Sequence, residues 1–396
     1  MFAKIDEVKT QVVRRLDLLR EEMTTLARQI HSKPEIGYQE HEASQLLVDF
    51  LKRHGFDARS PIAGMETAFL ATSSERPGGS RVAILAEYDA LPGLGHACGH
   101  NLIGTAAAGA GIAAASSLSG TDGGILVLGC PAEEACVDGA GGKVRLIQAG
   151  CFRDVDAALI FHPMPLTAVG GETSALAVLN FEFKGKAAHA AGNPWDGRNA
   201  LDGVLLTFGA INALRQHTRD GIRLHGIVTH GGDAPNIVPE YAAARFFVRS
   251  PSTEDLNQTL PRVESCARGA AMATGTDVVI SRAHHTYEAM RTNAILAGII
   301  QRNLEKVGLR IEGRKKGKGS TDFGNVSRVT PACELSIRLG DGIAPHTREF
   351  LEAANSDEGI EVMMLGAKVM AMTALDLLMS PEVLKTAKSE FQGTLA

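Results

Sequence analysis

The chain has 396 residues, of which 44% are hydrophobic and 21% are charged, a composition that excludes wholesale disorder. Its 40 basic and 45 acidic side chains give a net charge of −5, so the sequence shows no basic footprint for nucleic acid. The length indicates two or three domains at about 150 residues each, and six cysteines are too few for a disulfide scaffold, which favours a reducing compartment.

The first predicted helix covers residues 5–31, with charges at helical spacing, and it stops before Pro34. This segment lacks the apolar core of a signal peptide. A long weakly polar run begins at Met363, but it contains Lys368 and Asp376 and is therefore predicted to be a buried helix. We expect no membrane-spanning segment and a cytoplasmic location.

After a second predicted helix at 40–54, short apolar runs alternate with helical patterns up to about residue 161. The runs TAFLAT, RVAILAEYD, GILVLGC and AALIF are predicted to be strands, and an alanine-rich helix is predicted after Asn101. Repeated strand–helix–strand units favour an α/β fold with a mostly parallel sheet that is covered on both faces.

From about residue 170 the pattern changes to alternating apolar and polar residues, which is typical of antiparallel strands. We predict an α+β insertion of four strands and two helices, followed by a return to the first domain. The expected boundaries are 1–171 and 288–396 for the catalytic domain, and 172–287 for the insertion.

The richest group of potential metal ligands is the loop HACGHN, where a thiol and an imidazole two residues apart, Cys98 and His100, can face one cation. A second group, Glu133 and Glu134, follows the strand GILVLGC. Neighbouring side chains in extended backbone point in opposite directions, so one carboxylate can bind a cation while the other faces the substrate. A solvated glutamate pair is the alternative interpretation.

Two further histidines, His162 and His346, lie at a strand end and in a loop that enters a helix. A single histidine in either place is more often a packing residue. Taken together, the candidate donors belong to strand ends and loops of one domain, where ligands bind in α/β sheets. They suit two divalent ions, Zn²⁺, Mn²⁺, Co²⁺ or Ni²⁺, better than one closed structural zinc site. These donors are Cys98, His100, Glu134, His162 and His346.

The ordered motifs along the whole chain resemble those of the M20 metallopeptidases. Within that family the sequence is similar to the amidohydrolase branch, which includes N-acyl-amino-acid, auxin-conjugate and aminobenzoyl-glutamate hydrolases and carnosine-dipeptidase-like proteins. The motifs are HSKPEIGYQEHEAS, GMETAF, HACGHN, PAEE, GKAAHAAGNPWDGRNAL, NIVPEYAAARFFVRS and GSTDFGN. The resemblance implies a zinc-peptidase-like catalytic domain, a lid and dimerisation domain at 172–287, a homodimer and a small amide substrate.

The resemblance also implies roles for individual residues. It makes Glu133 the general base, and it makes the five donors the ligands of two metal ions per subunit, with Cys98 as the bridge. In the insertion it assigns substrate binding to His189, which is expected to act across the dimer, and to Asn236 and Arg249. A plain loop residue is the alternative interpretation for His189, and a surface ion pair is the alternative for Arg249.

One segment departs from the wider family, which has a metal-binding His and a supporting Asp in an HxD pattern. Here the pattern reads Glu87-Tyr88-Asp89. We predict that Asp89 orients a ligand as an outer-shell residue, that the first-ligand role falls to the HACGH loop, and that Asp322 lies in a loop at the mouth of the active site or caps a helix. The expected reaction is hydrolysis of an N-acyl amino acid, an aminoaryl amino acid or a dipeptide. The alternatives are an aminohydrolase that releases ammonia and a catalytically inactive metal-binding scaffold.

Overall fold

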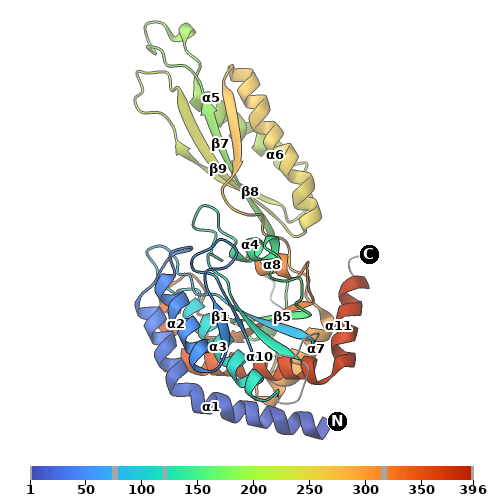
Figure 1. Ribbon diagram of the computed structural model, residues 1–396. Coiled ribbons are helices and arrows are strands. Elements are labelled where there is room, and N and C mark those ends of the chain that lie inside the picture. Colours follow the sequence, from blue (N-terminus) through green and yellow to red (C-terminus); the bar gives the residue numbers. More distant parts are fainter. Residues whose placement is uncertain (1, 74–78, 119–122, 314–318, 394–396) are drawn as a thin grey trace. The chain divides into compact units, whose positions relative to one another are not determined.

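The computed structural model describes residues 2–73, 79–118, 123–313 and 319–393, and it divides the chain into two units (Figure 1). The first unit contains the described residues within 1–172, 290–317 and 321–396. The second contains Thr173–Ala289 together with Gly319 and Ser320. Each unit has a sheet and an apolar core of its own.

A seven-stranded sheet forms the centre of the first unit, and its strands have the order β1-β2-β4-β3-β5-β11-β6. The four strands from β4 to β11 pair in parallel, whereas β1, β2 and β6 pair antiparallel at the two edges. The mostly parallel sheet predicted from the apolar runs is thus confirmed. The strands are β1 Asp57–Arg59, β2 Phe69–Thr72, β3 Arg81–Ala86, β4 Gly124–Gly129, β5 Ala157–Met164, β6 Ala168–Val169 and β11 Ala332–Arg338.

The helices of the first unit bury the central strands. Every residue of β4 is buried, and because alternate side chains point to opposite faces, both faces of the sheet must be covered. Helix α3 consists largely of alanine and glycine, and these small side chains let it pack closely against β3, β4 and β5. The helices are α1 Phe2–Ser32, α2 His41–Arg53, α3 His100–Ser116, α4 Gly142–Gln148, α7 Ala294–Lys306, α8 Phe323–Val326, α9 Arg348–Ala353, α10 Asp357–Met379 and α11 Pro381–Gly393.

Helix α10 is long and apolar enough to cross a membrane by length and composition, but 78% of its most apolar window is buried in the structure. Two charged residues in the buried part of this helix, Lys368 and Asp376, pair with neighbouring helices. Lys368 Nζ lies 2.7 Å from Asp17 of α1, and Asp376 lies 2.6 Å from Lys9 Nζ, which also donates to Asn303 of α7. This burial and pairing are those of a core helix.

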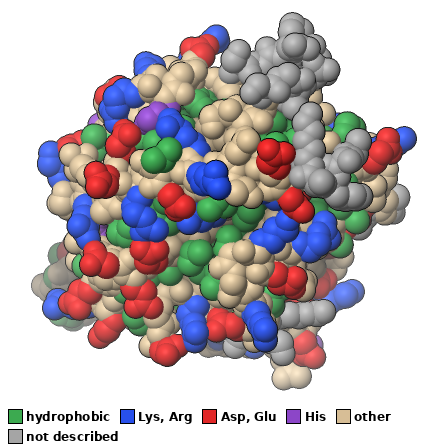
Figure 2. Space-filling view, turned by 90° about the horizontal axis from the view of Figure 1, so that it is seen from below, with side chains coloured by type: hydrophobic (Ala, Val, Ile, Leu, Met, Phe, Trp, Pro, Cys, Tyr) green, Lys and Arg blue, Asp and Glu red, His purple; other side chains and the backbone are tan. Residues whose placement is uncertain are grey.

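Further ion pairs join α1 to α10 at the surface. Arg28 lies 2.7 Å from Asp357, and Arg20 pairs with Glu361. On the face drawn in Figure 2, acidic and basic side chains are interspersed with apolar ones. Exposed pairs of this kind contribute about 0–1 kcal/mol, so apolar packing is the main force that holds α1 against α3 and α10.

The second unit is a four-stranded antiparallel sheet in the order β10-β7-β9-β8. Helices α5 and α6 pack against β7 and β9, and the aromatic side chains of Phe181, Phe183 and Phe246 are completely buried in this core. The predicted four strands and two helices are confirmed. The elements are β7 Ala175–Lys184, α5 Ala200–Arg215, β8 Arg223–His230, β9 Tyr241–Ser250, α6 Thr253–Thr274 and β10 Asp277–Arg282, with a short 3₁₀ turn at Pro194–Asp196.

Three strands of the first sheet were absent from the sequence prediction. Strands β1 and β6 have only three and two residues, too few to show a period. Strand β11, with the sequence ACELSIR, is buried along almost its whole length although it contains Glu334 and Ser336. Polar residues at buried positions hide the apolar run by which the other parallel strands are found.

A glycine links the predicted ligand loop to α3. Gly99 is the N-cap of α3 and has φ +78°, a left-handed conformation in which L side chains are strained. A Cβ atom placed there would lie 2.4 Å from Pro163 Cγ. Both the backbone conformation and the contact with β5 therefore require glycine.

We predict that Gly99→Ala lowers the free energy of unfolding of the metal-free protein by roughly 2–4 kcal/mol, from left-handed strain and overpacking together. Gly139→Ala is the matched control, because Gly139 also has φ +78° but a Cβ there would meet no atom within 4 Å. Urea unfolding followed by circular dichroism measures both variants. Equal losses for the two variants would show that the contact with Pro163 is unimportant.

A buried carboxyl group supports the segment that follows β4. Glu40, at the N-terminus of α2, accepts hydrogen bonds from Ala132 N at 2.8 Å and Thr67 Oγ1 at 2.9 Å. Burial, and after it the charge of Asp89, raise the pKa of the Glu40 carboxyl to about 7. The folded state therefore holds this proton more tightly than the unfolded chain does.

The raised pKa of Glu40 predicts how the free energy of unfolding changes with pH. The stability that protonated Glu40 contributes is fully present below pH 4.5 and is lost as the pH rises through 7. Glutamine does not titrate, so Glu40→Gln does not lose this contribution. When the pH is raised from the acidic range to 8, the free energy of unfolding of Glu40→Gln should therefore rise by up to about 3 kcal/mol relative to that of the native sequence. Urea unfolding at several pH values measures this difference. A difference that stays constant with pH contradicts the assignment.

Candidate metal centre

The predicted ligands of the first unit come together at the carboxyl ends of β3, β4 and β5. Cys98 lies in the loop before α3, and His100 is the first residue of that helix. Glu133 and Glu134 follow β4, and His162 belongs to β5. The segment carrying His346 joins them because its backbone N donates to Ala97 O at 2.8 Å. Neighbouring parallel strands thus deliver residues that are distant in sequence to one edge of the sheet.

One group of donor atoms comprises Cys98, His100 and Glu134, whose ligand atoms all lie within 4.8 Å of one another. His346 Nε2 lies 3.3 Å from Glu134 Oε1. Hydrogen bonds to Cys98 and Glu134 raise the pKa of His346 to about 10. A proton and a metal ion compete for the same imidazole lone pair. A divalent ion bound here can therefore replace the proton of His346.

Asp89 contacts His100 and Glu134 through atoms that do not face the centre. Its Oδ1 lies 2.9 Å from His100 Nδ1, and its Oδ2 accepts a hydrogen bond from Glu134 N at 3.0 Å. A carboxylate on Nδ1 directs Nε2 of the same ring toward the centre. This geometry is the one expected of a residue that orients His100, as predicted for Asp89.

A second group of donor atoms comprises Glu87, His100 and His162, again within 4.8 Å of one another. His162 Nε2 lies 3.1 Å from Glu87 Oε2, and the opposite ring nitrogen, Nδ1, lies 3.5 Å from Glu334 Oε1. Glu87 and Glu334 are both buried. His162 is therefore held between two carboxylates, one of which, Glu87, faces the same centre as His100.

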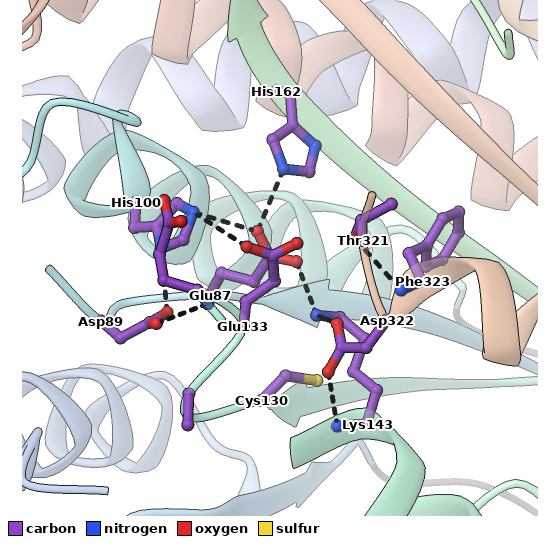
Figure 3. Close-up of polar contacts among 12 residues, drawn as sticks. Glu87, Asp89, His100, Cys130, Glu133, Lys143, His162, Thr321, Asp322 and Phe323 are labelled. Atoms are coloured by element: carbon purple, nitrogen blue, oxygen red, sulfur yellow. Dashed lines mark hydrogen bonds and ion pairs between the residues drawn. The ribbon is translucent and has the colours of Figure 1, made fainter. Parts of the chain in front are cut away.

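The structure places Asp322 at the N-cap of α8, the position of the alternative interpretation, although its side chain makes no capping hydrogen bond. It also adds a residue without a predicted role, Lys143. Both side chains are completely buried, so Asp322 does not lie in an open loop at the mouth of the active site. Lys143 Nζ contacts Asp322 Oδ1 and lies 2.6 Å from Glu87 Oε1, and Lys143 N donates to Asp322 Oδ2 at 2.9 Å (Figure 3). These contacts between Lys143 on α4 and Asp322 hold the loop before α8 in the interior of the unit. No sequence pattern indicates a contact between residues 179 positions apart.

Glu133 lies beside this network. Its Oε2 is 4.0 Å from His100 Nε2, and only 7% of the residue is exposed. Burial, followed by the charges of Glu87 and Glu134, raises the pKa of the Glu133 carboxyl well above its ordinary value. A carboxyl group in such surroundings is suited to accept and return a proton.

The residues fit divalent metal ions. His100 Nε2 is buried and makes no hydrogen bond in the described part of the chain, although carboxylate oxygens surround it. Such an atom is costly to bury unless a cation or proton neutralises the site. Sulfur, nitrogen and oxygen donors together are typical of Zn²⁺ and similar borderline ions.

The three residues predicted to bind substrate belong to the second unit. His189 and Asn236 lie on adjacent segments, because His189 pairs with Ile237 and Ala190 N donates to Asn236 O at 3.0 Å. Arg249 lies elsewhere, at the end of β9, where its Nη1 donates to Ser320 Oγ at 2.9 Å. His189 and Asn236 are exposed.

Comparisons with known proteins agree with this geometry. Residues 172–274 match the family description "Peptidase dimerisation domain". The chain is 36% identical to the Xaa-Arg dipeptidase of Mus musculus, over 99% of this chain and 94% of that protein. It is 30% identical to a p-aminobenzoyl-glutamate hydrolase chain of Escherichia coli K12, over 94% of this chain and 92% of that protein.

A solved structure has the same fold. It is that of a dinuclear metal-binding peptidase of the M20 family from Bacillus subtilis, with a TM-score of 0.69 and 18% identity, and the match covers 92% of this chain and 99% of that one. The whole-length identity to the mouse and bacterial enzymes confirms the resemblance seen in the motifs. The chain belongs to the M20 family of metal-dependent peptidases and amidohydrolases.

Proposed function

We propose that this chain hydrolyses the amide bond of a dipeptide with a basic C-terminal residue and releases that residue as a free amino acid. The observation that carries the proposal is the 36% identity to an Xaa-Arg dipeptidase over 99% of the chain. Relatives named for N-acetylcysteine or indole-3-acetyl-aspartate match only 62% and 47% of the chain. The second candidate substrate is an aminobenzoyl-glutamate, because that relative matches 94% of the chain.

We assign the metal-binding role to the donors that converge in the first unit, and we expect two divalent ions in each copy of the chain. Zn²⁺ or Mn²⁺ is expected, and the mixed donors also permit Co²⁺ or Ni²⁺. When bound, such ions polarise the amide carbonyl and lower the pKa of the attacking water. The residues that would hold them are Cys98, His100, Glu134, His162 and His346.

The chain itself moves the proton. We propose that Glu133 accepts a proton from the attacking water and then returns it to the amine that leaves. Its burial beside Glu87 and Glu134 supports this role, since a carboxyl group with a raised pKa holds a transferred proton long enough to deliver it. Asp89 keeps His100 and the Glu134 backbone in place during the reaction.

We propose that His189 stabilises negative charge on the substrate carbonyl oxygen, acting across a dimer. Its Nδ1 accepts hydrogen bonds from Ala191 N at 3.2 Å and Gly192 N at 3.0 Å. The accepting nitrogen carries no proton, so Nε2 is the donor that a substrate oxygen would meet. Asn236 and Arg249 are proposed to bind the substrate carboxylate.

We propose that residues 172–287 form the lid and dimerisation domain of a homodimer. The match of residues 172–274 to a peptidase dimerisation domain supports this. Strand β8 supports it as well, because it is an edge strand whose Ile227 is 65% exposed and Val228 42% exposed. Unpaired edge strands with apolar side chains readily pair with another chain. The proposed location of the protein is the cytoplasm.

A substrate panel tests the proposed activity. We expect dipeptides ending in arginine or lysine to be cleaved with kcat/KM at least about tenfold above p-aminobenzoyl-glutamate and N-acetyl amino acids, since a site built to pair with a polar substrate group rejects analogues that lack it by that much or more. Chromatography of the released amino acid measures the rates, and an ammonia assay runs in parallel. Ammonia as the product supports an aminohydrolase instead. Absence of turnover with any added metal supports an inactive scaffold.

The role of Glu133 makes a separate prediction. Glu133→Ala and Glu133→Gln should each lower kcat by about 10²–10⁴-fold, the usual contribution of a general base, while metal content stays at that of the native protein. Steady-state kinetics and elemental analysis of the same samples measure both quantities. Retained turnover in either variant refutes the assignment. Loss of metal together with activity would instead make Glu133 a ligand.

A further inference from the structure

Glu87 is not among the predicted metal ligands, yet it lies between the two imidazole rings of the centre. The residue directly follows β3 and is completely buried. Its two oxygens face different partners. Oε1 lies 2.6 Å from Lys143 Nζ, whereas Oε2 lies 3.1 Å from His162 Nε2 and 3.5 Å from His100 Nε2 (Figure 3).

The orientation of the His100 ring leaves room for a cation near Oε2. The carboxylate of Asp89 accepts a hydrogen bond from His100 Nδ1, so the opposite nitrogen, Nε2, faces Glu87. A lone pair on Nε2 would repel the lone pairs of the carboxylate. A cation beside Oε2 would remove this repulsion, and the same cation would lie next to His162 Nε2, which is 3.1 Å from that oxygen.

The spacing of the three atoms agrees with a shared cation. Nitrogen and oxygen ligands that lie 2.0–2.2 Å from a tetrahedral ion are separated from each other by about 3.3–3.6 Å. Glu87 Oε2 lies 3.1 Å and 3.5 Å from the two Nε2 atoms, and all three lie within 4.8 Å of one another. We infer that Glu87 is an additional protein ligand of the metal centre, beyond the five donors proposed above. This inference rests on the proposed metal-dependent function.

Lys143 and Asp322 hold Glu87 in this orientation. Lys143 is completely buried on α4 and is itself paired with Asp322, whose Oδ2 also accepts from Lys143 N. The lysine binds Oε1 and so leaves Oε2 to face the two rings. It also compensates part of the negative charge that an extra carboxylate brings into a buried site. Lys143 and Asp322 are thus positioning residues for Glu87.

Metal affinity tests the inference, with Glu87→Gln as the main variant. The amide has nearly the shape of the carboxylate but no charge, and Asp322 still pairs with Lys143. After chelation and dialysis, proteins are equilibrated with Zn²⁺ at a series of buffered free concentrations, and bound metal is counted by elemental analysis. We expect one of the two equivalents to bind at least about 100-fold more weakly than in the native chain, a loss at or beyond the upper end of that caused by removing an outer-shell partner.

Asp376→Asn is the matched control, because it removes the carboxylate of another buried lysine pair, that of Lys9 and Asp376, in the same unit. We expect this control to bind Zn²⁺ like the native chain. Glu87→Asp is the second variant. It keeps the charge that Lys143 needs but withdraws the oxygen by about 1.5 Å, so a ligand role predicts weaker binding, whereas a purely structural ion pair predicts native affinity. The visible spectrum of the Co²⁺-loaded proteins reports the ligand set independently of activity.

The outcomes separate this inference from the proposed function. If the native chain binds two equivalents and cleaves dipeptides, but both Glu87 variants bind Zn²⁺ with native affinity and give the native Co²⁺ spectrum, Glu87 is not a ligand and only the inference fails. If the native chain binds no metal, the proposed function fails as well. Should Glu87→Gln not fold, as judged by circular dichroism, the affinity of Glu87→Asp decides.

Discussion

Buried carboxylates converge with imidazole nitrogens and a thiol at the carboxyl ends of β3, β4 and β5, where little water can solvate their charge. Glu87, Glu133, Glu134 and Asp322 are all nearly or fully enclosed. Burying several like charges together is unfavourable unless positive charge lies among them. The need for that positive charge explains why a lysine is buried in this place and why divalent ions fit the remaining space.

Two sources of positive charge compensate these carboxylates, one on each side of the cluster. On one side Lys143 is fixed between Glu87 and Asp322 by contacts within the chain. On the other side, where the donor atoms of His100, His162 and His346 converge with those of Glu87 and Glu134, metal ions would provide the charge. The charge of Lys143 is a permanent part of the fold. The charge of metal ions is exchangeable, and a metal centre can keep an open position for substrate and water.

Much of this could be predicted from the sequence, because strong local signals exist for it. Apolar runs identify β3, β4 and β5, and a position at or beyond the end of an apolar run identifies Glu133, Glu134 and His162 as candidates. The order of the motifs along the chain indicates the M20 family, and the whole-length identity to known members confirms it. Strand β11 escaped prediction because Glu334 and Ser336 interrupt its apolar character although both are buried.

The roles around Glu87 could not be predicted, for a physical reason. A glutamate just beyond a strand is usually solvated, and only the convergence of α4 with the loop before α8 buries it against Lys143 and Asp322. Such convergence is a property of tertiary packing and leaves no spacing pattern in one chain. The same holds for Glu40, whose contact with Ala132 joins segments 92 residues apart.

The central claim is that these side chains hold two metal ions at the ends of three parallel strands. Anomalous diffraction from crystals of the metal-loaded protein, recorded on both sides of the absorption edge of the bound metal, tests it most directly. The account predicts two anomalous peaks, each within about 2.5 Å of donor atoms of this cluster, with Cys98 or Glu134 next to at least one of them. A catalytically active protein whose crystals show no anomalous peak at this cluster, or show peaks only elsewhere, would contradict the account.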